Sequence, residues 1–241
     1  MRLILKSHRI SKGLVVDLGC GSGLLAEKLS AAGYHVLGID ASPAFISIAR
    51  KRVPSARFRR GSLFKAALPR CAALVSTGEV LNYMFDPESS LKGLARLFRR
   101  VHAALEPGGL FLFDLADPGQ VLSGRVVRGF TEGSDWVVLV DKKEDHQRHL
   151  LTRRIITFRK AGEKWRRGEE IHRQRLYEPS VVLRLLTRAG FHSRAFRRYG
   201  SFRLPEGHTA FLARKARVRG FSATDEHRSG NSGALPLTPS T

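Results

Sequence analysis

The apolar positions in the first half of the chain form short runs that alternate with amphipathic stretches. Residues at helical spacing, such as Leu91, Leu94 and Phe98, predict helices between the runs, and the longest helix is expected to open at residues 86–88. Strands that alternate with helices favour a parallel sheet covered on both faces, in a doubly wound α/β arrangement. The strands are expected at residues 13–18, 35–40, 56–59, 72–76 and 110–113.

After residue 114 the pattern changes to successive runs of β-forming residues. Polar or glycine-bearing turns separate these runs, which lie at residues 136–140, 150–158 and 165–176. They predict an antiparallel flap of three or four strands inserted at about residues 120–177. In its last strand, His172 and Gln174 share one face, while Arg173 and Arg175 share the other, because side chains alternate along a strand.

Beyond the flap the α/β pattern returns. A helix is expected after Pro179, ending at Gly190, and residues 194–199 and 209–213 are expected to pair as a closing hairpin. The last residues are rich in Ser, Gly, Pro and Thr, which is typical of disorder. The expected organisation is a short N-terminal segment at residues 1–12, one domain at 13–214 and a disordered tail at 215–241.

Composition and charge narrow the class of protein. No apolar run approaches the roughly 20 residues that cross a bilayer. The first residues also lack the apolar length of a secretory signal, so a cytoplasmic protein without a membrane partner is expected, as a monomer or homodimer. Cys20 and Cys71 have no spacing typical of zinc or a disulfide framework, so free thiols and no metal are expected. The formal charge of +21 favours anionic partners, although dispersed arginines are equally explained by compositional bias.

A glycine-rich stretch, DLGCGSG at residues 17–23, follows the first predicted strand. Gly19, Gly21 and Gly23 tolerate positive φ and lack a Cβ, so backbone N–H groups there can approach a ligand at the start of the next helix. Asp40 ends the second predicted strand, where a carboxylate can accept both hydroxyls of a ribose. The alternative is a tight turn that binds nothing.

Five segments in order carry a family resemblance: VVDLGCGSG, LGIDASP, RRGSLF, ALVSTGEVLNYM and LEPGGLFLFDL. They resemble the motifs of class I S-adenosylmethionine-dependent methyltransferases, and the resemblance covers roughly residues 13–214. It implies a Rossmann-like, doubly wound sheet of seven mostly parallel strands with the β flap inserted. It also implies S-adenosyl-L-methionine as cofactor.

The same resemblance implies roles for particular residues. The glycines would pass under the methionine half of the cofactor, and Asp40 would bind the ribose. The family often places an acid near Ser62 for the adenine, and this chain has none there. The implied cofactor-binding residues are Asp17, Gly19, Cys20, Gly21, Gly23, Asp40, Ala41, Ser62, Leu63, Thr77 and Gly78.

Three residues are candidates for catalysis. The resemblance implies that Glu79 lies beside the transferred methyl group, and Tyr83 follows the same loop. His172 is a candidate base in the flap, which a hydroxyl acceptor would need. The alternatives are an exposed loop carboxylate for Glu79, helix packing for Tyr83 and a surface position for His172.

The motifs argue against two kinds of nucleic-acid methylation. Residues 76–79 do not form the Asn/Asp-Pro-Pro-aromatic motif of enzymes that methylate exocyclic amines of bases, and Cys71 precedes the fourth strand, on the wrong side of the sheet for the nucleophile that C5 methylation of pyrimidines needs. The flap and the helix after it, YEPSVVLRLLTRAGF at residues 177–191, instead resemble the small-molecule branch of the family. This resemblance implies methyl transfer to an N or O atom of a small molecule, with anions among the candidates. An RNA methyltransferase and a non-catalytic S-adenosylmethionine-binding protein are the alternatives.

Overall fold

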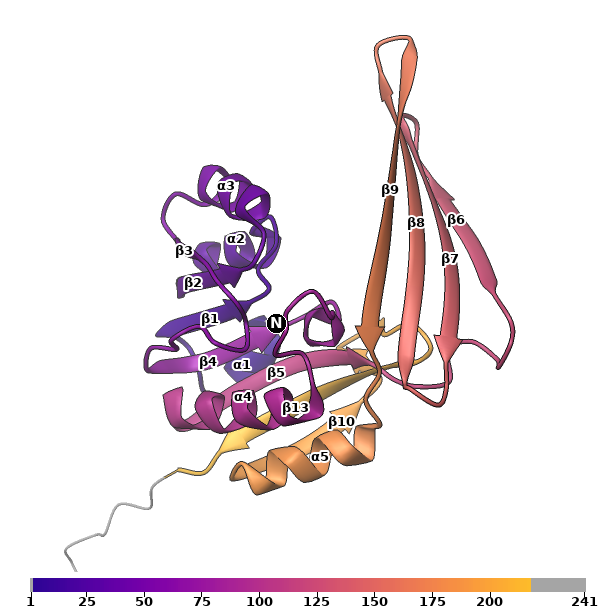
Figure 1. Ribbon diagram of the computed structural model, residues 1–241. Helices are drawn as coiled ribbons and strands as arrows, with labels where there is room; N and C mark the ends of the chain where they lie inside the picture. The colour runs from indigo at the N-terminus through magenta and orange to yellow at the C-terminus, as the bar shows by residue number, and fades with distance from the viewer. Residues whose placement is uncertain (1, 218–241) are drawn as a thin grey trace, which may run out of the picture.

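The computed structural model describes residues 2–217, and its main feature is a seven-stranded sheet (Figure 1). The strand order is β10-β13-β5-β4-β1-β2-β3. Six strands run in the same direction, whereas β13 runs antiparallel to both of its neighbours, β10 and β5, which confirms the predicted mostly parallel sheet. The strands are β1 (Leu14–Leu18), β2 (His35–Asp40), β3 (Arg57–Arg60), β4 (Cys71–Ser76), β5 (Leu105–Ala116), β10 (Phe191–Phe196) and β13 (His208–Lys215). From residue 218 onward, the predicted disordered tail lies outside the described residues.

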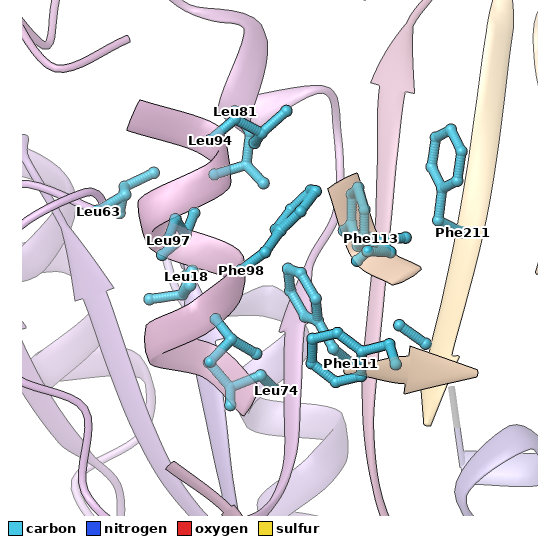
Figure 2. Packing of buried hydrophobic residues seen from close by; sticks show 14 of the residues in the cluster. Leu18, Leu63, Leu74, Leu81, Leu94, Leu97, Phe98, Phe111, Phe113 and Phe211 are labelled. Atoms are coloured by element: carbon cyan, nitrogen blue, oxygen red, sulfur yellow. The ribbon is translucent and has the colours of Figure 1, made fainter. Parts of the chain in front are cut away.

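Helices cover both faces of this sheet and enclose two hydrophobic clusters. In Figure 2, Phe98 of α4 lies beside Phe111 and Phe113 of β5, with Phe211 of β13 next to them. Each of these side chains is fully buried, and burial of a Phe contributes about 1.5–3 kcal/mol. The helices are α1 (Arg2–Ser7), α2 (Leu24–Ala31), α3 (Pro43–Arg52), α4 (Leu91–Ala104) and α5 (Pro179–Arg188), with the 3-10 turn η1 (Val80–Asn82). No helix of the described residues is both long and apolar enough to span a membrane.

Local capping chemistry explains one wrong helix boundary. The helix expected to open at residues 86–88 begins instead at Leu91, because the Ser90 hydroxyl accepts a hydrogen bond from the Gly93 N–H at 3.0 Å. Asp86 forms a turn before it, in which its carboxylate accepts from the Glu88 N–H at 3.0 Å. Because Asp86 lies in a turn and uses only Oδ1 there, its Oδ2 atom can accept a hydrogen bond from another part of the chain.

The predicted flap is a separate four-stranded antiparallel sheet that projects from the domain (Figure 1). Its root is fixed by the buried amide of Asn82, which donates to the carbonyls of Ala116 and Arg175 and accepts from the Ala116 N–H. Asn82 therefore joins the main sheet to the flap. The flap strands are β6 (Val127–Glu132), β7 (Trp136–Asp145), β8 (Leu150–Ala161) and β9 (Lys164–Arg175), and a short hairpin, β11 (Arg198–Tyr199) and β12 (Phe202–Arg203), precedes β13.

Candidate functional site

The glycine loop after β1 is tied directly to the end of β2. Gly19, Gly21 and Gly23 have φ values of 78°, 50° and 84°, the left-handed region that glycine adopts without strain. The Gly21 N–H donates to Oδ2 of Asp40 at 2.9 Å, and the Ser42 N–H donates to Oδ1 at 2.8 Å. The predicted proximity of the glycine loop and Asp40 is therefore present. A Cβ placed on Gly21 would meet no protein atom within 4 Å, so the backbone there is open to a ligand.

Asp17 is a buried carboxylate with unused hydrogen-bonding capacity beneath this loop. Its Oδ2 atom has no partner, and its side chain is 2% exposed. Burial, and secondarily the charge of Asp40, raises the pKa of Asp17 to about 7. A cationic group of a ligand would stabilise the ionised form. S-adenosylmethionine carries an ammonium group for Asp17 and ribose hydroxyls for Asp40, so this donor and acceptor set fits the cofactor.

The other predicted cofactor residues near the glycine loop have no ionised side chain to offer a ligand. Burial raises the pKa of the Cys20 thiol to about 12, so the thiol is neutral and Cys20 offers a ligand only its backbone. Cys71 is also a free, buried thiol. Leu63 is buried in the core, and Ala41 is half-buried beside Asp40.

Sequence reasoning missed an acidic residue beside Ser62. The Ser62 hydroxyl donates a hydrogen bond to Oδ2 of Asp86, whose side chain is largely buried. The position where the family often has an acid therefore has a carboxylate supplied from 24 residues further along the chain. The interpretation of residues 86–88 as a helix start concealed this contact.

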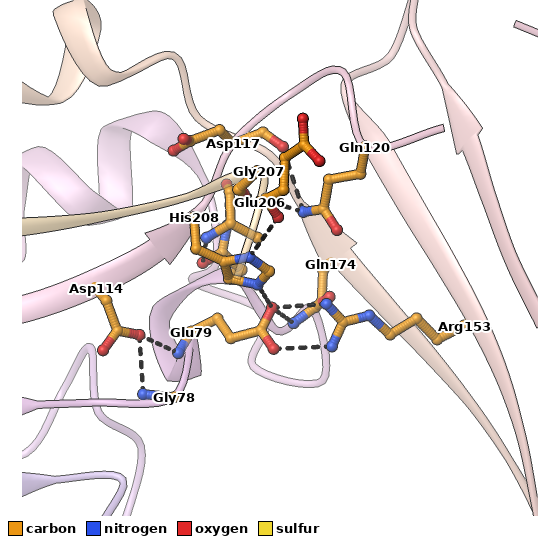
Figure 3. Close-up of polar contacts among 12 residues, drawn as sticks. Gly78, Glu79, Asp114, Asp117, Gln120, Arg153, Gln174, Glu206, Gly207 and His208 are labelled. Carbon is orange, nitrogen blue, oxygen red and sulfur yellow. Dashed lines mark hydrogen bonds and ion pairs between the residues drawn. The ribbon is translucent and has the colours of Figure 1, made fainter. Parts of the chain in front are cut away.

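Asp114 holds the loop that follows β4. Its Oδ1 atom accepts hydrogen bonds from the N–H groups of Gly78 at 2.9 Å and Glu79 at 2.6 Å (Figure 3). Its Oδ2 atom accepts from the Tyr199 hydroxyl at 2.8 Å. Burial raises the pKa of Asp114 despite these donors. The predicted methionine-side residues Thr77 and Gly78 are thus positioned by β5 and by the β11–β12 hairpin.

Glu79 is the centre of a charged cluster that joins the loop, the flap and β13 (Figure 3). Its carboxylate accepts from Nη1 and Nη2 of Arg153 at 2.9 and 2.8 Å, from Nε2 of Gln174 at 3.1 Å, and lies 3.2 Å from Nε2 of His208. The side chain is only 17% exposed, so the alternative of an exposed loop carboxylate is wrong.

These partners set the ionisation of Glu79. Burial alone would raise its pKa, but hydrogen bonds from His208 and Arg153, together with their charges, outweigh burial and lower the pKa to about 2. Glu79 is therefore ionised at neutral pH and a poor proton acceptor. Its predicted place beside the methyl group stays a prediction, and the geometry favours a role in positioning over one as a base.

Tyr83 and His172 contact each other at the flap root. Their rings meet edge to face with centroids 5.5 Å apart, and Nε2 of His172 lies 2.7 Å from a carboxylate oxygen of Glu170. Burial raises the pKa of Tyr83. Two cavities lie beside Glu79 and are described below, and neither Tyr83 nor His172 lines either of them. The catalytic roles expected for them stay predictions, without a cavity contact to support them.

Two neighbouring cavities share Glu79, Pro205 and His208 in their walls. The loop cavity, of about 420 Å³, lies beside the loop after β4, and its other lining residues include Leu25, Thr77, Asp114, Tyr199 and Phe202. The flap cavity, of about 350 Å³, lies against the flap, and its other lining residues include Phe130, Val140, Lys142, Arg153 and Ile155. Sequence reasoning missed Lys142, Arg153 and His208, since no local motif distinguishes them from the other basic residues.

Comparison with known proteins adds evidence on the family. A family described as "Methyltransferase domain" matches residues 15–109. Trans-aconitate 2-methyltransferase of Paracidovorax citrulli (strain AAC00-1) is 34% identical over 126 residues, which are 51% of this chain and 46% of that protein. This match thus spans less than half the length of that relative.

Solved structures share the fold over most of the chain. A S-adenosylmethionine-dependent methyltransferase from Clostridium acetobutylicum ATCC 824 aligns with a TM-score of 0.76 at 18% identity, covering 89% of this chain and 88% of that one. The sugar N-methyltransferase KedS8 from Streptoalloteichus sp ATCC 53650 aligns with a TM-score of 0.72 at 17% identity, covering 90% and 85%. At these identities the likeness establishes the fold.

Proposed function

We propose that this protein is a class I S-adenosylmethionine-dependent methyltransferase that transfers a methyl group to an N or O atom of a small, anionic molecule. The match of residues 15–109 to a family described as "Methyltransferase domain" supports this proposal. The observation that carries the proposal is the pair of adjoining cavities that begins at Thr77 and ends among cationic flap residues. Volumes of about 420 and 350 Å³ are in the range of small-molecule sites.

The residues present can hold the cofactor and align the reactants. Bound S-adenosylmethionine supplies a methyl group on a sulfonium, an excellent leaving group, so alignment of the reacting atoms is much of the protein's task. In this proposal Asp40 binds the ribose and Asp17 the ammonium group; the bond from Gly21 to Asp40 and the unpartnered Oδ2 of Asp17 support these roles. Asp114 and Tyr199 fix the loop that carries Glu79. An acceptor carboxylate or unprotonated amine needs no base, which agrees with the low pKa of Glu79.

The proposal is tested by cofactor binding followed by a methyl-transfer screen. Calorimetry with S-adenosylhomocysteine is expected to show binding at one site. Labelled S-adenosylmethionine is then offered with small acids, amines, phenols and RNA, and transfer to a small molecule is the expected result. Absence of binding would remove the enzyme interpretation. Transfer to RNA alone, with affinity that falls steeply as salt rises, would replace it with the nucleic-acid alternative.

Replacing Asp40 tests the placement of the nucleoside. Asp40→Ala is expected to weaken S-adenosylhomocysteine binding roughly 10- to 100-fold, corresponding to about 1–3 kcal/mol for unpaired hydroxyl and amide groups. The loss includes the Gly21 N–H bond that orders the glycine loop. Glu163→Ala removes the same charge from the exposed flap tip and serves as the control in calorimetry. Equal affinity of the Asp40 variant and wild type would show that the ribose lies elsewhere.

A further inference from the structure

We propose that the acceptor is bound through a carboxylate group, held in the flap cavity by Lys142 and Arg153. This inference rests on the proposed methyl transfer and specifies how its substrate is recognised. Both residues line the cavity of about 350 Å³ and come from neighbouring flap strands, β7 and β8, where Lys142 is paired directly with Arg153. Each side chain therefore reaches the same side of the flap sheet.

The charges around this cavity do not balance. Lys142 and Arg153 are two cations, His208 lies close by, and Glu79 is the one carboxylate in the cavity wall. The hydrogen bond that Nε2 of His208 donates to Glu79 raises the pKa of His208, which favours its protonated, positively charged form. The cavity therefore carries an excess of at least one positive charge before a ligand binds.

Lys142 is the cation that lacks a partner. Among the described residues, no carboxylate lies within the 4.0 Å of an ion pair with its ammonium group, whereas Arg153 is paired with Glu79. Partial burial, followed by the like charge of Arg153, lowers the pKa of Lys142. Arg153 also keeps a buried Nε–H without an acceptor. An anion at this point would relieve the repulsion between the two cations.

The chemistry of the cavity favours a carboxylate over an amine or a neutral acceptor. Arg153 lines the cavity and binds the Glu79 carboxylate through both Nη atoms, and its buried Nε–H, which has no acceptor, is left to donate to a second planar oxyanion. A protonated amine would meet two cations at the same place. Phe130, Val140 and Ile155 supply apolar wall, which suits an organic acid with an apolar portion.

The test separates this inference from the proposed function. Lys142→Met keeps the length of the side chain and removes its charge, and Lys143→Met does the same at the adjacent, exposed position of β7. Wild type and both variants are first titrated with S-adenosylhomocysteine, and equal affinities are expected. If wild type does not bind S-adenosylhomocysteine, the proposed function itself is rejected, whatever the acceptor.

The loaded proteins are then titrated and assayed with fumarate, succinate, benzoate and phenylacetate, each beside its primary amide. We expect wild type to bind or methylate acids and not amides. We expect Lys142→Met to raise the Kd or KM for acids at least tenfold, with kcat within about twofold of wild type, and Lys143→Met to change neither. Cofactor binding without binding of any acid, activity on amines alone, or an unchanged KM in Lys142→Met would overturn the carboxylate proposal while leaving methyl transfer standing.

Discussion

Gly21→Ala is expected to weaken S-adenosylhomocysteine binding by at least tenfold while leaving the protein folded. In the free protein the added Cβ meets no atom within 4 Å, so the cost to folding is limited to the left-handed backbone, about 1–2 kcal/mol. The same methyl group would occupy the open space into which we place the cofactor. Calorimetry measures the affinity, and urea unfolding measures the free energy of unfolding.

Two other glycines separate the effect on binding from that on backbone strain. Gly33→Ala carries the same kind of strain, at φ 87° and with open space, in the turn between α2 and β2 away from the glycine loop. It should lower stability without changing affinity. Gly19→Ala would place its Cβ 2.3 Å from Cγ1 of Val80, so the loop must move, and we expect a loss of about 2–4 kcal/mol of stability. Equal affinity for Gly21→Ala and Gly33→Ala would contradict our placement of the cofactor.

Glu79→Gln is expected to destabilise the folded protein by about 3 kcal/mol at pH 6. The lowering of the Glu79 pKa from 4.5 to about 2 corresponds to this value, since one pKa unit is about 1.4 kcal/mol. The variant also leaves Arg153 without a compensating charge in a largely buried position. Urea unfolding across pH measures the difference between wild type and variant.

The pH dependence of that difference has a definite sign. Glu79 has a lowered folded-state pKa, so its contribution is present above pH 4.5 and is lost as pH falls toward 2. His208 has a raised pKa, so its part is present below 6.5 and disappears as pH rises through the folded-state value. The penalty of Glu79→Gln should therefore be largest between these limits.

A double-mutant cycle isolates the ion pair. Combining Glu79→Gln with Arg153→Met should cost clearly less than the sum of the two single variants, because the double variant leaves neither charge unpaired. Glu163→Gln at the exposed flap tip is the control and should change stability little. Additive losses, or a penalty that does not vary between pH 3 and pH 6, would show that Glu79 and Arg153 are not coupled as the structure indicates.

The sequence alone determined the architecture and the closeness of the glycine loop to Asp40. Alternating apolar runs and helical stretches predicted the parallel sheet, and local motifs placed the glycine loop and Asp40 at the ends of adjacent strands. In the structure a 2.9 Å bond joins Gly21 to Asp40. Period-two alternation also grouped His172 with Gln174 correctly, since Gln174 contacts Glu79 and His172 is paired with Arg153 across β8 and β9.

Only the tertiary structure decided which residues surround the flap cavity. Glu79 meets Arg153 across 74 positions of sequence, and Ser62 meets Asp86 across 24. Periodicity predicts on which face of its own strand a residue lies, because it is a pattern over a few neighbouring residues. It does not predict which distant segment packs against that face. Which cations converge on Glu79 depends instead on how the flap leaves its root at Asn82 and how β13 returns beside β5. These long-range contacts leave no local pattern, so Lys142, Arg153 and His208 could be found only once the chain was folded.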